Sequence, residues 1–152
     1  MKIVIQRCIK SSVEVDNKIV GSIDKGVMLL VGFTNGDNEE IIDYMVDKII
    51  NLRIFDDENG VMNKSLIDVS GSILSISQFT LYGDASKGRR PSYVKAMKGE
   101  ESVLLYEVFN KKLRNKNIKV ETGIFGADMK VSLINDGPVT IILESENKNE
   151  EG

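Results

Sequence analysis

The stretch best suited to chemistry is Ser77, Gln78, Phe79 and Thr80. It follows residues 72–76, an apolar run interrupted by serine that predicts a buried strand, and Gly83–Asp84 closes the segment as a turn. A strand that ends in a hydroxyl, an amide, an aromatic ring and a second hydroxyl can present all four at the floor of a pocket. The alternative is an ordinary strand end, at which small polar side chains satisfy nearby backbone groups.

The absence of histidine restricts the chemistry. Histidine is the commonest general base and metal ligand, so Ser-His-Asp and Cys-His catalysis are excluded. Cys8 is the single cysteine, and in an apolar strand it is typical of a small buried hydrophobic residue. The acidic turn at residues 56–60 lacks the ligand spacing of a calcium loop. We therefore expect no metal and no cofactor, and an enzyme of this sequence would draw its base from an unusual source or from the substrate.

A basic segment follows the candidate site. Residues 84–98 contain five basic residues and one acidic residue. Lys87, Arg89 and Arg90 are the candidate phosphate contacts, although such a charge run also fits a solvated loop. The net charge of -3 argues against a strongly electrostatic, nonspecific nucleic-acid binder but leaves room for a local basic patch.

Gly137-Pro138 is the second candidate signal. Glycine permits backbone angles closed to other residues, and proline lacks an N–H donor, so nearby carbonyl groups can point into a pocket. The alternative is a tight turn with a trans peptide bond, and sequence physics alone does not reveal the isomer. The glycine-rich segment 123–128 lacks the Lys-Ser/Thr signature of a phosphate-binding loop.

The 152 residues predict one α/β domain over residues 1–145, followed by a polar tail at 146–152 that we expect to fray. Hydrophobic residues make up 41% and charged residues 28%, as in a globular protein. No bilayer-spanning run or signal peptide is visible, so we expect a cytoplasmic protein without membrane contact. The periodicity predicts a helix at about 38–52, capped by Asn38 or Asp37, and a second helix at 99–116. The apolar side of the first helix is Ile42, Met45, Val46, Ile49 and Ile50, and that of the second is Val103, Leu104, Val108 and Leu113. Strands are predicted at 2–9, 12–15, 19–23, 26–33, 72–82, 118–121, 129–134 and 139–143, with a short hairpin turn at Asp16-Asn17-Lys18. Seven or eight strands and two helices favour two sheet layers with helices covering one side.

Seven motifs, in order over about residues 1–145, resemble the D-aminoacyl-tRNA deacylase family, which includes D-tyrosyl-tRNA deacylase. They are Val4-Ile5-Gln6-Arg7, Leu52-Arg53-Ile54-Phe55, Met62-Asn63, Ser77-Gln78-Phe79-Thr80-Leu81-Tyr82, Lys87-Gly88-Arg89-Arg90-Pro91-Ser92, Gly126-Ala127-Asp128-Met129 and Asn135-Asp136-Gly137-Pro138-Val139-Thr140.

The resemblance implies a β/β/α layered fold and a homodimer that hydrolyses the ester between a D-amino acid and the terminal adenosine of tRNA. DNA is not an expected partner. It also implies that the Gly137-Pro138 bond is cis and enters the partner subunit's pocket, and that Arg7 holds this loop. The carbonyl groups of Gly137 and Pro138 can accept from the substrate ammonium while occupying the space of an L side chain. Such exclusion predicts that glycyl-tRNA is also cleaved.

The substrate implied by the resemblance is an activated ester with a neighbouring ribose hydroxyl. Its hydrolysis needs little more from the enzyme than a positioned water and a stabilised oxyanion. The backbone N–H groups of Phe79 and Thr80 are the candidate oxyanion donors. Ser77 and Gln78 would fix the strand end and the adenosine ribose. Thr80 is the less favoured candidate nucleophile, because no adjacent base is evident.

Three other functions fit parts of the sequence. A related editing hydrolase would remove a misattached L-amino acid. A noncatalytic RNA-binding or assembly protein is disfavoured by the acidic balance and by the lack of an exposed aromatic run. A small-molecule esterase would need a nucleophile–base pair, which is missing.

Overall fold

The computed structural model describes residues 1–145, so the expected fraying of residues 146–152 concerns residues outside this range. The elements within the described residues are β1 (Lys2–Val15), β2 (Lys18–Ile23), β3 (Gly26–Gly32), α1 (Glu39–Asn51), β4 (Phe55–Asp56), β5 (Met62–Lys64), β6 (Ser72–Ser77), the 3-10 helix η1 (Phe79–Tyr82), α2 (Glu100–Arg114), β7 (Val120–Thr122) and β8 (Lys130–Glu144). The predicted α/β class with two main helices is confirmed, whereas β4 and β5 lie outside the predicted strands.

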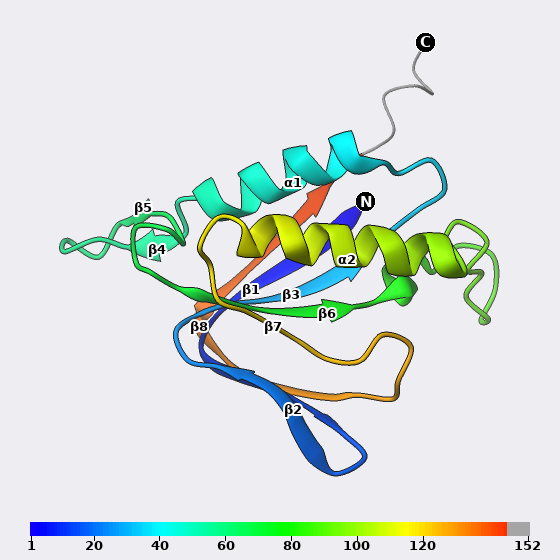
Figure 1. Cartoon of the computed structure of the whole chain (residues 1–152), viewed down its shortest axis with the longest axis horizontal. Coiled ribbons are helices and arrows are strands. Elements are labelled where there is room, and N and C mark those ends of the chain that lie inside the picture. Colours follow the sequence, from blue (N-terminus) through cyan, green and yellow to red (C-terminus); the bar gives the residue numbers. More distant parts are fainter. Residues whose placement is uncertain (146–152) are drawn as a thin grey trace.

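One sheet runs in the order β2-β1-β3-β6-β7, and β8 also pairs with β1. The β3–β6 and β6–β7 pairs are parallel, whereas the other pairs in this sheet are antiparallel. Both helices lie over the same face of this sheet, and the β1–β2 hairpin swings away below it (Figure 1). The second β layer is therefore the bent-over part of the same sheet, which leaves β4 and β5 as a small separate pair.

Two apolar cores hold these layers together. The larger core lies between the sheet and the helices and includes Ile3, Leu29, Ile42, Ile73 and Phe109. The smaller core includes Cys8, Val13, Ile23, Met28, Leu74 and Ile76 on the opposite face. Because side chains alternate along a strand, β1, β3 and β6 contribute to both cores and are fixed from both sides.

The helices follow from capping and periodicity. The Asn38 side chain accepts a hydrogen bond from the Ile41 N–H at 3.0 Å, which caps α1 as predicted. The buried face of α1 also matches the prediction, whereas that of α2 differs. Leu113 is buried as predicted, together with Tyr106 and Phe109, but Leu104, predicted to lie on the same side as Leu113, is 60% exposed.

Two predicted strand breaks are wrong. Residues 2–15 form one strand, in which the Ser11 hydroxyl is satisfied by donating to the Ser132 carbonyl at 2.8 Å. Residues 130–144 likewise form one strand, because pairing with β1 continues on both sides of Gly137-Pro138. The predicted strand 72–82 in turn ends at Ser77, and η1 follows it.

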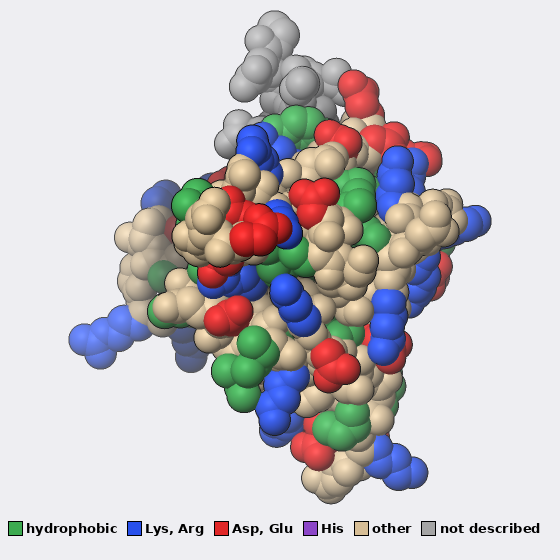
Figure 2. Space-filling model, turned by 90° about the vertical axis from the view of Figure 1, so that its left-hand side faces the viewer, with side chains coloured by type: hydrophobic (Ala, Val, Ile, Leu, Met, Phe, Trp, Pro, Cys, Tyr) green, Lys and Arg blue, Asp and Glu red, His purple; other side chains and the backbone are tan. Residues whose placement is uncertain are grey.

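The turn between β1 and β2 matches the prediction. Asp16 and Asn17 both have positive φ, at 49° and 64°, which suits the right-handed twist of a short hairpin. On the face that Figure 2 shows, acidic and basic side chains are interspersed rather than gathered into one patch. Among the residues that the structure describes, neither helix has the length and apolar character needed to cross a bilayer.

Candidate active site

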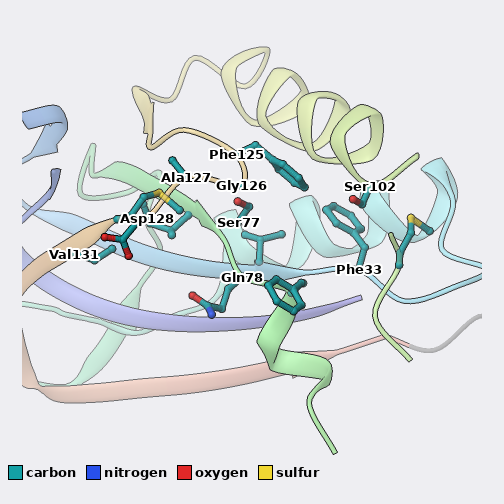
Figure 3. Close-up of a pocket in the computed structure, with 15 residues that line it drawn as sticks. Phe33, Ser77, Gln78, Ser102, Phe125, Gly126, Ala127, Asp128 and Val131 are labelled. Atoms are coloured by element: carbon teal, nitrogen blue, oxygen red, sulfur yellow. The ribbon is translucent and has the colours of Figure 1, made fainter. Parts of the chain in front are cut away.

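A cavity of about 290 Å³ lies where the parallel strands β3 and β6 end. Val31 pairs with Ser77 in this ladder, so the carboxyl ends of both strands meet at one edge of the sheet. Ligands commonly bind beyond the carboxyl ends of parallel strands. Ser77 and Gln78 extend from the end of β6 into this region, with Phe33 and Ser102 at one end of the cavity (Figure 3).

Three of the four predicted residues line the cavity. Ser77, Gln78 and Phe79 are among the lining residues, whereas Thr80 is not. The Gln78 amide Nε2 donates a hydrogen bond to the Thr80 hydroxyl, which ties the two side chains together. An amide is not a general base, so this contact does not activate Thr80 as a nucleophile.

The backbone after Gln78 starts a short 3-10 helix next to the cavity. The first N–H groups of a helix have no partner within it, and η1 begins at Phe79. Phe79 and Thr80 occupy this first turn, ahead of Leu81, whose N–H donates to the Gln78 carbonyl at 3.3 Å. Their N–H groups can therefore serve a developing oxyanion.

Gly32 allows this backbone to lie close to β3. A Cβ atom at Gly32 would lie 2.9 Å from the Gln78 carbonyl oxygen and 3.2 Å from the Leu81 Cβ. Any larger residue would push η1 away from the sheet. The position of the candidate oxyanion donors thus depends on a glycine in the neighbouring strand.

The opposite wall was missed by the sequence analysis. Phe125, Gly126, Ala127 and Asp128 face Ser77 and Gln78 across the cavity (Figure 3), and Met129 also lines it. Gly126 has a φ of 78°, a conformation that favours glycine. The sequence analysis placed residues 126–129 among the motifs of the family resemblance and tested the glycine-rich segment as a phosphate-binding loop, but it assigned none of these residues to the site.

Gly137-Pro138 lies in a bulge of β8, and its peptide bond is cis. On β1 only Arg7 separates Gln6 from Cys8, while their β8 partners Thr140 and Asn135 are separated by four residues. Residues 136–139 thus stand opposite the single residue Arg7 and form a bulge, in which both Gly137 and Pro138 are exposed.

Arg7 supports the bulge from beneath. It is 6% exposed, and its Nε donates to the Asp136 carbonyl while its Nη1 donates to the Ile54 carbonyl, both at 2.8 Å. Its Nη1 also lies 3.3 Å from an Asp56 carboxylate oxygen. The contact that the resemblance implied between Arg7 and the Gly-Pro loop is therefore present through Asp136.

Asn135 closes the bulge and was not predicted as a site residue. Its Oδ1 accepts from the Val139 N–H at 2.7 Å, and its Nδ2 donates to the Val139 carbonyl at 3.3 Å and the Thr140 hydroxyl at 3.2 Å. The signal available in the sequence was its position in a motif directly before Gly137-Pro138. Arg7 and Asn135 together fix both ends of the bulge.

The two predicted site regions do not meet within one chain. Neither Gly137 nor Pro138 is among the residues that line the cavity. Lys87, Arg89 and Arg90 are exposed on the segment between η1 and α2 and do not line the cavity either. Among residues 1–145 there is no cluster of three or more potential metal-ligating side chains.

The cavity lies at the carboxyl ends of two parallel strands of a small α/β fold, and polar side chains, among them Ser77, Gln78 and Asp128, line it together with apolar ones. The sequence model of the family described as D-Tyr-tRNA(Tyr) deacylase matches residues 4–144. A D-aminoacyl-tRNA deacylase of Bacillus velezensis is 57% identical over 145 residues, which covers 95% of this chain and 99% of the relative. One of Brevibacillus brevis is also 57% identical and is covered completely.

Solved structures share the fold. A structure described as c-Myc DNA Unwinding Element Binding Protein superposes with a TM-score of 0.90 at 41% identity, over 96% of this chain and 99% of that one. A probable eukaryotic D-amino acid tRNA deacylase superposes with a TM-score of 0.82 at 19% identity, over 93% and 97% of the two chains.

The chain belongs to the D-aminoacyl-tRNA deacylase family. It is a hydrolase of the ester bond between an amino acid and tRNA, and aminoacyl-tRNA is its substrate class.

Proposed function

We propose that the chain removes D-amino acids, and glycine, from the terminal adenosine of tRNA and rejects L-aminoacyl-tRNA. The observation that carries this proposal is the cavity at the end of β6, where Ser77 and Gln78 stand beside the first N–H groups of η1. This arrangement suits an ester that is already activated.

In the proposed reaction a water attacks the ester carbonyl and the ester carbon–oxygen bond breaks. The Phe79 and Thr80 N–H groups stabilise the oxyanion, and losing one such donor typically costs about 10²–10³ in rate. The departing oxygen belongs to the adenosine ribose, and its neighbouring hydroxyl assists the proton transfer. Ser77 and Gln78 position the ribose, so the chain needs no histidine.

Chirality is set by a second subunit in this proposal. Gly137 and Pro138 are exposed in the β8 bulge and lie outside the cavity of their own chain. Within residues 1–145, β8 pairs only with β1 and exposes Ile134 and Ile142, at 46% and 65%. Open strand edges and exposed apolar side chains favour association, which supports a homodimer that brings the bulge of one subunit into the cavity of the other.

The test compares D-tyrosyl-tRNA, L-tyrosyl-tRNA and glycyl-tRNA with purified protein and no added metal. We expect fast loss of the D form, measurable loss of the glycyl form and survival of the L form. Resistance of glycyl-tRNA would contradict selection by exclusion, since glycine has no side chain to clash. Preferential loss of the L form would favour the editing hydrolase.

We further propose that Lys87, Arg89 and Arg90 contact tRNA phosphates. None of the ion pairs among residues 1–145 includes these side chains. Replacing all three by glutamine should weaken the binding of D- and L-aminoacyl-tRNA equally. It should also lower the slope of log affinity against log salt by the amount expected for the loss of up to about three phosphate contacts. An unchanged slope of log affinity against log salt would identify the segment as a plain solvated loop.

A further inference from the structure

Two aromatic rings lie together at the rim of the cavity. Phe79 lines the cavity, yet 57% of the residue is exposed. The Tyr93 ring packs against it edge to face, with ring centroids 5.2 Å apart and an interplanar angle of 66°. Because the two rings meet edge to face rather than face to face, part of their aromatic surface stays open to solvent beside the cavity. Neither apolar core includes the Phe79 ring or the Tyr93 ring, so the packing of the cores does not account for this exposed pair.

The segment that carries Tyr93 is held in place. Asp84 and Ser92 exchange two backbone hydrogen bonds of 2.8 Å, and the Met97 N–H donates to the Phe33 carbonyl at 3.0 Å. The Tyr93 ring also packs on the Gly83 backbone, because a Cβ atom at Gly83 would lie 3.0 Å from its Cε1. The aromatic pair is therefore a fixed surface of the molecule.

The segment that carries Tyr93 is rich in positive charge. Residues 84–98 contain five exposed cations: Lys87, Arg89, Arg90, Lys95 and Lys98. None of them is in an ion pair found among residues 1–145. Unneutralised cations beside exposed aromatic rings are the combination that binds single-stranded nucleic acid, with bases stacked on the rings and phosphates near the cations.

We propose that Phe79 and Tyr93 form a stacking site for the unpaired nucleotide next to the terminal adenosine of tRNA. This inference rests on the proposed function, which places that adenosine in the cavity that Phe79 borders. The strand leaving the cavity on this side meets the aromatic pair, and its phosphates lie near the cations of residues 84–98. The Phe79 ring thus binds RNA while its backbone N–H serves the oxyanion.

The test measures binding of two analogues in which D-tyrosine is joined to the ribose by an amide that the protein does not hydrolyse. One analogue ends in adenosine alone, and the other carries a cytidine before it. The dissociation constant of the shorter analogue divided by that of the longer one gives the affinity contributed by the extra nucleotide. Because a base stacked on an aromatic ring contributes substantially, we expect Tyr93→Ala to reduce that ratio roughly tenfold.

Tyr44→Ala is the matched control, since Tyr44 is an exposed tyrosine on α1, at 52%, outside the cavity lining. It should keep the full ratio. Phe79→Leu, which retains an apolar side chain and the backbone N–H, should reduce the ratio as Tyr93→Ala does. Replacing the cytidine by 5-iodocytidine should give a photocrosslink to Phe79 or Tyr93, located by mass spectrometry.

An unchanged ratio in both variants, or a crosslink confined to other residues, would overturn the stacking site. A rise in the dimer dissociation constant of Tyr93→Ala with no change in the ratio would also overturn it, because a second copy would then cover the rings. Since the amide analogues are not turned over, a reduced ratio in a protein that fails to hydrolyse D-tyrosyl-tRNA would contradict the proposed function alone.

Discussion

At the scale of single residues, hydrogen bonds between hydroxyl and amide groups fix the strand end that forms the floor of the site. The Gln78 amide and the Thr80 hydroxyl bond to each other, and the Ser75 hydroxyl behind them is bonded to the Tyr106 hydroxyl at 3.2 Å. The Tyr106 hydroxyl in turn donates to the Ser75 carbonyl at 2.8 Å, which fixes α2 on β6. Burial raises the pKa of Tyr106, so this contact stays neutral over the usual working range.

Cys8 gives the clearest pH prediction. Burial raises the pKa of its thiol from 9.0 to about 11. The unfolded chain then loses this proton before the folded chain does, so the free energy of unfolding should fall as the pH rises through that interval. We expect the wild-type chain to lose more stability across it than Cys8→Ala, measured by urea unfolding at a series of pH values. Parallel losses in both proteins would show that Cys8 does not titrate in this way.

At the scale of elements, the β8 bulge is the feature that sequence patterns describe least well. The Gly-Pro step suggested a break between two strands, whereas the ladder with β1 continues past it. Hydrophobic alternation reports which face a residue occupies but not whether pairing resumes after an insertion. The cavity wall at residues 125–129 was missed for a related reason, because its position depends on how the segment returns to the sheet.

Other elements follow directly from local signals. The cap at Asn38, the inward face of α1 and the hairpin at Asp16-Asn17 depend on spacing and turn residues alone. The polar end of β6 was also visible in the sequence. The sequence did not show that this end of β6 lies beside the end of β3, because parallel pairing joins segments that are distant in the chain.

Asn135→Ala tests whether the bulge sets the chiral preference. The substitution removes three hydrogen bonds that close the bulge, so Gly137 and Pro138 should lose their fixed position. We expect the ratio of D- to L-tyrosyl-tRNA hydrolysis to fall about tenfold, while the unfolding free energy falls by about 1–2 kcal/mol. Thr140→Val, which removes one of the three contacts, is the control and should keep most of the ratio. A full D preference in Asn135→Ala would remove the bulge from the selection step.

At the scale of the whole molecule, the proposed chiral selection requires two subunits. The cavity and the bulge are both present in each chain but do not meet there. A twofold dimer can bring each bulge to the opposite cavity, because the same patch then serves on both subunits. The acceptor end of tRNA would approach along the side where residues 84–98 carry their cations.

The measurement that tests this claim most directly mixes two variants that we expect to be inactive, one with a filled cavity and one whose bulge no longer places the Gly137 and Pro138 carbonyl groups to accept the substrate ammonium. Ala127→Trp fills the cavity of one subunit, and Gly137→Ala distorts the bulge of the other, since its Cβ would lie 2.8 Å from Val139 Cγ2 and 3.0 Å from Arg7 Nη2. In a mixed dimer one site combines the intact cavity of one subunit with the intact bulge of its partner. After subunit exchange, random mixing makes half of the dimers mixed, each with one intact site of two, so we expect about a quarter of the wild-type D-tyrosyl-tRNA hydrolysis. No recovery, with mixed dimers verified by native mass spectrometry, would mean that the cavity and the bulge do not act across the subunit interface.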